Sequence, residues 1–84
     1  MHSGSSVSRF DDALRLSALA PGTTAVVRRV VGGDSRADRL AALGVTPGAV
    51  VHVLQTFPGV VFRCDETELA VEPAVTRSIL VELL

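Results

Sequence analysis

The sequence predicts a mainly β protein: a small closed or partly closed barrel of about five short strands, with one short helix inserted. Length is the first reason, because 84 residues make one small domain and leave no room for a second. The second reason is that short β-branched segments alternate with glycine, proline and aspartate turns, about every 8 to 12 residues. The third is that these segments carry few charges, so closing the sheet would protect edges that otherwise pair with other chains.

The expected strands lie between these turns. The segment Phe10 to Ala20 has helical content but stays ambiguous, and Pro21-Gly22 ends it. Before the last strand, Ala74 to Ser78 is expected to form a single helical or 3₁₀ turn after Pro73. The five strand segments, each rich in apolar or β-branched residues, are Thr23 to Val31, Ala49 to Gln55, Val60 to Cys64, Glu68 to Glu72 and Ile79 to Leu83.

The inserted helix is expected over Ser35 to Leu43. Ser35 can serve as the N-cap, with Asp38 three residues further on, and Gly44 is placed to adopt the left-handed conformation that ends a helix. A helix this short is marginal alone in water, so its apolar side must pack on the rest of the protein. That side is a stripe at helical spacing, made of Ala37, Leu40, Ala41 and Leu43.

Both faces of the expected strand from Ala49 to Gln55 are apolar. Val51 and Val53 share one face, whereas Val50, His52 and Leu54 share the other. We expect the segment from Phe10 to Leu19 to fold over the outer face, with self-association into a homo-oligomer as the other possibility.

The hairpin near residue 65 orients the single cysteine. Alternation places Cys64 beside Phe62 on the core side and turns Asp65 outward, where Asp65-Glu66-Thr67 forms the turn. A lone buried cysteine most often acts as a small hydrophobic residue. Phe57, beside Pro58 in the preceding turn, is expected to close one mouth of the barrel, or else to be an exposed anchor.

Composition excludes several classes of protein. The 48% apolar content and formal net charge of −1 are untypical of a disordered chain. All eight basic residues are arginine, and Trp and Tyr are absent, so we expect no nucleic-acid partner. One cysteine cannot form an internal disulfide. The three phenylalanines are too few for the aromatic groove that recognises proline-rich peptides.

No apolar stretch approaches the roughly 20 residues needed to span a membrane, so we expect no direct membrane insertion. Residues 1–9 are rich in Ser and Gly and lack the pattern of a signal peptide. The sequence therefore predicts a disordered leader over 1–9, one domain over 10–84 and a cytoplasmic location.

Several motifs together resemble the FeoA family. In order they are Leu16-Ser17-Ala18-Leu19, Pro21-Gly22, Gly32-Gly33, Leu40-Ala41-Ala42-Leu43-Gly44 and Thr46-Pro47-Gly48, followed by the segment from Phe57-Pro58-Gly59 to Val71. The second half is also similar to the C-terminal domain of DtxR/MntR-type metalloregulators. The resemblance covers Leu16 to Glu82, and its most specific part is Leu40 to Gly48.

The resemblance implies an SH3-like barrel. It also implies a small cytosolic accessory protein, not a catalyst, that acts beside FeoB, the membrane GTPase-transporter for ferrous iron in bacteria. The alternative is a free-standing metal-responsive sensor or regulatory domain related to the DtxR/MntR C-terminal domains. In those regulators the DNA-binding and dimerisation parts are separate, and 84 residues leave room for neither.

The residues themselves also point away from catalysis. Of the two histidines, His2 lies in the leader, and His52 has no nucleophile and acid at a recognisable spacing. Pairs with metal-ligand spacing, such as Cys-x-x-Cys, are absent, so we expect no cofactor and at most weak divalent metal binding. The candidate ligands for such a metal ion are His52, Asp65 and Glu68.

The expected partner surface lies on the inserted helix. Arg36 and Arg39 are three residues apart and share one flank, which we place away from the apolar stripe. Arginine is enriched at protein interfaces. We therefore predict that Arg36, Arg39, Leu40 and Leu43 contact the cytosolic part of a FeoB-like transporter.

Overall fold

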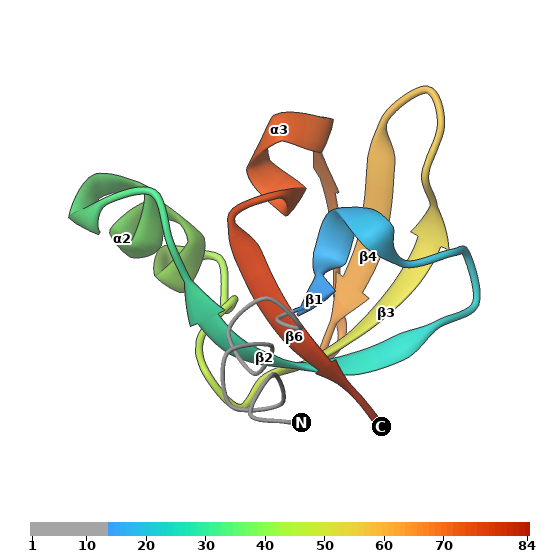
Figure 1. Cartoon of the computed structure of the whole chain (residues 1–84), viewed down its shortest axis with the longest axis horizontal. Helices are drawn as coiled ribbons and strands as arrows, with labels where there is room; N and C mark the ends of the chain where they lie inside the picture. The colour runs from blue at the N-terminus through green and yellow to red at the C-terminus, as the bar shows by residue number, and fades with distance from the viewer. Residues whose placement is uncertain (1–13) are drawn as a thin grey trace, which may run out of the picture.

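The chain forms one six-stranded antiparallel sheet, with short helical segments between some of the strands. The computed structural model describes residues 14–84 (Figure 1), and the predicted leader over 1–9 lies outside that range. The strands are β1 (Leu14–Arg15), β2 (Thr24–Val30), β3 (Val50–Gln55), β4 (Val60–Cys64), β5 (Thr67–Val71) and β6 (Ile79–Leu83). The helical segments are the 3₁₀ turn η1 (Leu16–Ala18), α2 (Asp34–Ala42) and α3 (Pro73–Thr76).

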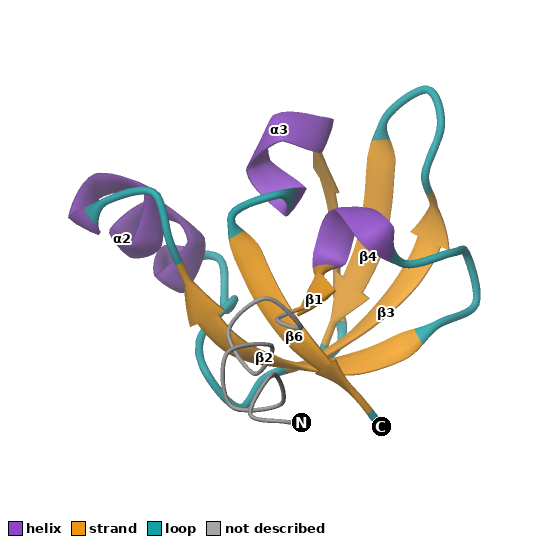
Figure 2. Ribbon diagram, in the orientation of Figure 1, coloured by secondary structure: helices purple, strands orange, loops and turns teal. Residues whose placement is uncertain are grey.

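The sheet has the order β1-β6-β2-β3-β4-β5, so β1 forms one edge and pairs with β6, the last strand of the chain. The register of β2 against β6 shifts between Val27 and Arg29, and that of β3 against β4 shifts between Val53 and Gln55. Such bulges bend a strand and increase its twist. The sheet consequently curls around its own core as a small barrel (Figure 2).

The core is filled from one side of every long strand, as the alternation predicted. Val51 and Val53 of β3 are buried, and so are Phe62 and Cys64 of β4, whereas Arg63 between them is exposed. Phe62, fully buried, is the largest residue of the core. Strand boundaries also agree closely, since Val60–Cys64 and Ile79–Leu83 match the expectation residue for residue.

The segment before Pro21 differs from the expectation. Leu14–Arg15 forms an extra strand that pairs with Leu80 and Val81 of β6, and only one 3₁₀ turn follows it. Leu16 and Leu19, three residues apart, are 1% and 6% exposed and belong to the core. A 3₁₀ turn brings positions three apart onto one side, which explains why both leucines point inward.

We expected the segment from Phe10 to Leu19 to cover the outer face of β3, but its described part does not do so. Residues 10–13 lie outside the described range. Val50 remains 40% exposed, while His52 and Leu54 are half-buried. Phe57 does not close the barrel either, because 84% of it is exposed. It belongs to the β3–β4 loop, which extends beyond the ends of the strands (Figure 1).

Helix α2 begins one residue earlier than expected. Gly33 is its N-cap and Ser35 lies within the first turn, so Ser35 does not cap the helix. The end is as predicted, since Gly44 has a φ of +94°. The N–H of Val45 donates to the carbonyl of Leu40, and that of Gly44 to Ala41, both at 2.9 Å, which is a Schellman motif.

The apolar stripe of α2 is narrower than predicted. Leu40 is its only buried residue, at 3% exposure, whereas Ala37 is half-buried, Ala41 is exposed and Leu43 is 46% exposed. Most of the stripe is not buried, because α2 stands away from the strands and touches the barrel near the C-terminal end of the helix (Figure 1). Within residues 14–84, no helix is long and apolar enough to cross a membrane.

The core role of the N-terminal segment predicts a large effect of Leu16→Ala. Removing a fully buried leucine should lower the free energy of unfolding by about 2–5 kcal/mol. Leu83→Ala, at a strand residue that is 56% exposed, should change it by less than about 1 kcal/mol. Urea unfolding followed by circular dichroism measures both, and equal stabilities would contradict this placement of Leu16.

The left-handed cap predicts a cost for Gly44→Ala of about 1–2 kcal/mol, because an L-residue disfavours this backbone conformation. A Cβ at Gly44 would meet no atom within 4 Å, so the cost is conformational only. Gly59→Ala is the matched control, because that glycine has no positive φ and its Cβ would lie 3.9 Å from its nearest neighbour. The prediction fails if the two variants melt at the same temperature.

Candidate functional site

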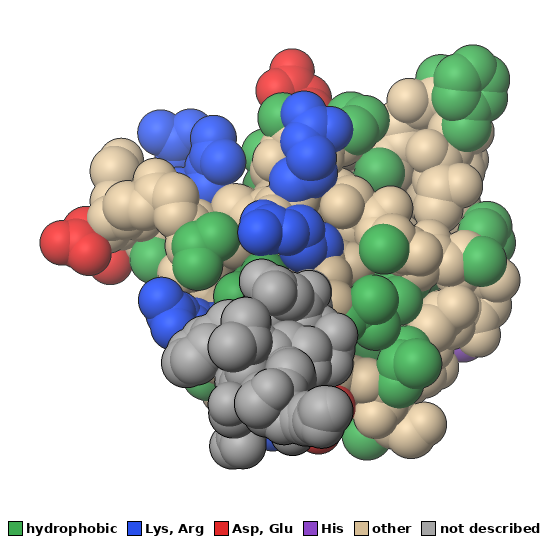
Figure 3. Space-filling view, viewed as in Figure 1, with side chains coloured by type: hydrophobic (Ala, Val, Ile, Leu, Met, Phe, Trp, Pro, Cys, Tyr) green, Lys and Arg blue, Asp and Glu red, His purple; other side chains and the backbone are tan. Residues whose placement is uncertain are grey.

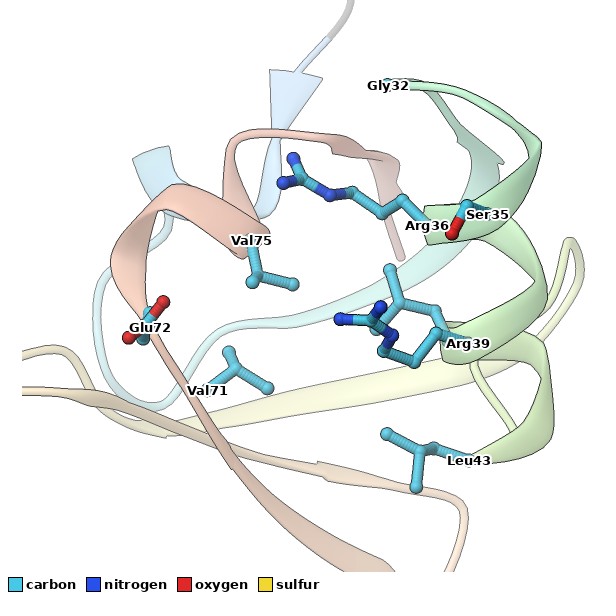
Figure 4. Close-up of a pocket in the computed structure, with 9 residues that line it drawn as sticks. Gly32, Ser35, Arg36, Arg39, Leu43, Val71, Glu72 and Val75 are labelled. Atoms are coloured by element: carbon cyan, nitrogen blue, oxygen red, sulfur yellow. The ribbon is translucent and has the colours of Figure 1, made fainter.

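A groove of about 380 Å³ separates α2 from the end of β5 and from α3. One wall is the side of α2 that carries Arg36, Arg39, Leu40 and Leu43 (Figure 4). The opposite wall consists of Val71, Glu72 and Val75, and Gly32 and Ser35 also line the groove. All four residues predicted to contact a partner therefore lie along one continuous hollow.

The groove exists because α2 is attached at one point. Leu40 enters the core, and the Schellman motif after it sends Val45, which is 1% exposed, into the core as well. At the other end, the stem of Arg36 lies over Gly32, and a Cβ on Gly32 would come within 3.3 Å of the Arg36 Cδ. Gly32 thus leaves room for this side chain to lie along the groove.

One detail of the sequence prediction is wrong. Arg36 and Arg39 do not lie on a flank away from Leu40, because all three line the same groove. Both arginine side chains extend from α2 toward α3 (Figure 4). Residues at spacings of three, four and seven share a helix face, so Arg36, Arg39, Leu40 and Leu43 fit one face. The apolar stripe and the arginine flank are adjacent parts of the same wall.

The charges of the groove are unbalanced. Within residues 14–84 the only ion pair joins Arg28 to Glu82, neither of which lines the groove, and both side chains are more than 60% exposed. Arg36 and Arg39 form no ion pair with a described residue, although Glu72 lines the facing wall. On the face shown in Figure 3, basic side chains gather toward the α2 and α3 side.

The opposite wall was not predicted. Val71, Glu72 and Val75 come from a part of the chain about thirty residues after α2, where β5 runs into α3. Nothing in their local sequence marks them as a surface, because Val71 and Val75 are typical of half-buried packing. Their role depends on the fold that brings α3 opposite α2.

The candidate metal ligands are only partly brought together. His52 and Asp65 line a second hollow, of about 530 Å³, which Arg63 and Glu66 also line. Glu68 is not among its lining residues. The Thr24 Oγ1 and His52 Nδ1 atoms are 2.7 Å apart and share a hydrogen bond. Among the described residues, no group of three or more His, Cys, Asp or Glu is placed to hold a metal ion.

Cys64 is buried on the core side, as predicted, and its thiol donates a hydrogen bond to the carbonyl of Gly44 at 3.3 Å. The hairpin is thereby joined to the loop that ends α2. Burial raises the pKa of the Cys64 thiol, and the negative charge of Asp65 raises it further. The neutral thiol is therefore the stable form, and a structural role fits it better than thiolate chemistry.

Comparison with known proteins identifies the family. The FeoA domain family matches residues 14–83, which is most of the chain. The chain belongs to the FeoA family. The resemblance drawn from Leu16 to Glu82 is thus confirmed, and the match begins two residues earlier, at the strand that the sequence did not reveal. No curated protein matches the chain significantly.

Solved structures confirm the fold of this FeoA-family chain. The crystal structure of an iron uptake regulatory protein (FeoA) has a TM-score of 0.80 and 25% identity, covering 86% of this chain and 97% of the other. FeoA of Stenotrophomonas maltophilia, complexed with zinc and described as a procaryotic SH3 domain protein, has a TM-score of 0.74 and 26% identity, covering 83% and 91%. The predicted SH3-like barrel is confirmed.

The likeness to a metalloregulator is one of fold alone. A manganese-dependent transcriptional repressor has a TM-score of 0.78 at 21% identity, covering 86% of this chain and 42% of the repressor. The same barrel fold therefore occurs as one part of a longer protein.

The buried thiol predicts slow alkylation in the native FeoA-family protein. Because its pKa is raised, Cys64 should react with iodoacetamide about ten-fold or more slowly than in the urea-unfolded chain. Stability should also fall as the pH rises past the ordinary thiol pKa, because the unfolded state releases its proton first. Mass spectrometry of a time course measures the rates, and equal rates would contradict the burial.

Proposed function

We propose that this protein is a small, non-enzymatic, cytoplasmic accessory protein that binds the cytosolic part of a FeoB-type ferrous iron transporter and modulates it. Family membership supports an iron-related role. One relative is described as an iron uptake regulatory protein, and the Stenotrophomonas maltophilia relative as a possible bacterial ferrous iron transport activating factor. Both descriptions fit an accessory protein better than a transporter or an enzyme.

The observation that carries the proposal is the groove beside α2. The four residues predicted from the sequence to contact a partner line one hollow, which combines apolar walls with two arginines that form no ion pair with any residue of 14–84. Interfaces typically centre on such partly apolar, arginine-containing patches. The rest of α2, including Ala41 and the acidic start at Asp34, would form the polar and neutral margin.

The mechanism we propose is a shift of population in the partner. The protein would bind one conformation of the transporter's GTPase part more tightly than another, and only that difference in affinity can regulate. A ten-fold difference corresponds to about 1.4 kcal/mol, which a few contacts of α2 can supply. No reaction on the protein itself is required, and no resident cofactor.

A metal-responsive regulatory domain is the alternative. The likeness to the manganese-dependent repressor shows the fold alone, so the accessory role is the better supported one. Binding of a divalent cation near His52 and Asp65 would be weak and incidental to the interaction through α2.

The double variant Arg36→Glu, Arg39→Glu tests the proposal. Two exposed cations become anions in the groove, so affinity for the purified GTPase domain of a FeoB-type transporter should fall about ten-fold or more. Isothermal titration calorimetry at fixed ionic strength measures the change.

The matched control is Arg29→Glu, Arg63→Glu, which alters net charge equally at two exposed arginines that do not line the groove. This control should retain most of the wild-type affinity. If the two double variants bind alike, the partner surface does not lie at α2, and if the wild-type protein does not bind the GTPase domain at all, the partner itself is wrong.

A further inference from the structure

The chemistry of the groove specifies what it can bind. Its apolar surface comes from Leu43, which is 46% exposed, and from the half-buried Val71 and Val75, with Leu40 at its base. A volume of about 380 Å³ lies near the lower end of the range for small-ligand pockets. The groove therefore suits a short peptide segment that inserts a large aliphatic side chain.

Arg36 and Arg39 add a requirement of charge. Both side chains extend into the groove, and neither forms an ion pair within residues 14–84 (Figure 4). Guanidinium groups pair with carboxylates through two parallel hydrogen bonds, which neutral groups cannot match. An occupant with carboxylates beside its apolar side chain would balance both cations.

Glu72 restricts how an acidic segment can be oriented in the groove. It lies on the wall opposite the arginines, so it repels a carboxylate placed on the α3 side. An acidic segment is therefore favoured only where its carboxylates face α2. Glu72 is the N-cap residue of α3 but makes no side-chain capping hydrogen bond, so its charge is not needed to hold that helix.

We propose that the groove binds an acidic-apolar peptide segment of the partner protein, with a large aliphatic side chain between Leu43, Val71 and Val75 and carboxylates on Arg36 and Arg39. This inference rests on the proposed function, because it names the part of the partner that this face recognises. Glu72 acts as a specificity determinant that fixes the orientation of the segment.

Synthetic peptides test the chemistry without the transporter. We would titrate the ¹⁵N-labelled full chain with acetyl-Glu-Glu-Leu-Glu-Glu-amide and follow its amide resonances. The matched peptides replace every Glu by Gln, or the Leu by Ser. We expect shifts concentrated in α2 and in residues 71–76, affinity about five-fold or more weaker for the Gln peptide, and about ten-fold weaker for the Ser peptide.

Variants of the protein separate recognition from a structural effect. Arg36→Gln, Arg39→Gln should reduce binding of the Glu peptide to the level of the Gln peptide, whereas Arg29→Gln, Arg63→Gln should not. Glu72→Gln should strengthen binding of the Glu peptide about two-fold, a gain that loss of structure cannot produce. All three variants change exposed residues, and their amide spectra report directly that the fold persists.

Three results would overturn the inference: no binding of the Glu peptide, equal binding of the Glu and Gln peptides, or shifts on another face. These results are distinct from failure of the proposed function. If the peptide binds but the transporter's GTPase domain does not, the inference about the groove stands and the partner is wrong. If the GTPase domain binds independently of Arg36 and Arg39, the proposed function stands and this inference fails.

Discussion

The attachment of α2 through one buried leucine determines the shape of the surface that we propose binds a partner. Leu40 and the Schellman motif that follows it fix the end of the helix, and Val45 continues directly into the core. No other residue of α2 is buried, so the face with Arg36 and Arg39 stands apart from α3. If Ala37, Ala41 and Leu43 were packed as Leu40 is, α2 would lie against the barrel and the groove would be filled. The incomplete packing of α2 thus leaves the groove open.

The barrel supplies the rigidity that this arrangement needs. Bulges in β2 and β3 curl a sheet of short strands around Phe62 and its aliphatic neighbours, and β6 joins the N-terminal strand to the centre of the sheet. Cys64 links the β4–β5 hairpin to Gly44 at the end of α2, so both walls of the groove are connected to the same core. Arg36 and Arg39 are exposed at this edge, where charges are tolerated at little cost, and they would become energetically important only if a partner excluded water from them.

Much of the fold could be predicted from the sequence, because local signals agree with long-range ones there. The alternation of Phe62 and Cys64 with Arg63 and the glycine after Leu43 each have one interpretation, and the structure agrees with both. Leu14 to Leu19 could not be read in this way: the sequence has helical content, and only pairing with β6, more than sixty residues away, makes part of it a strand. The same limit applies to the site. The α2 wall was recognisable from arginines at helical spacing, but Val71, Glu72 and Val75 become its counterpart only through the tertiary fold.

Amide hydrogen exchange, measured for the free protein and for its complex with the GTPase domain of a FeoB-type transporter, tests most directly whether the α2 surface is the working part of the molecule. In the free protein, α2 amides should exchange faster than those of β2 and β3, because a single anchor opposes local opening of the helix. In the complex, we expect protection to rise in α2 and α3 and to change little in the outer strands. Protection confined to the β3–β4 hairpin or the β5 edge, with α2 unaffected, would contradict the central claim.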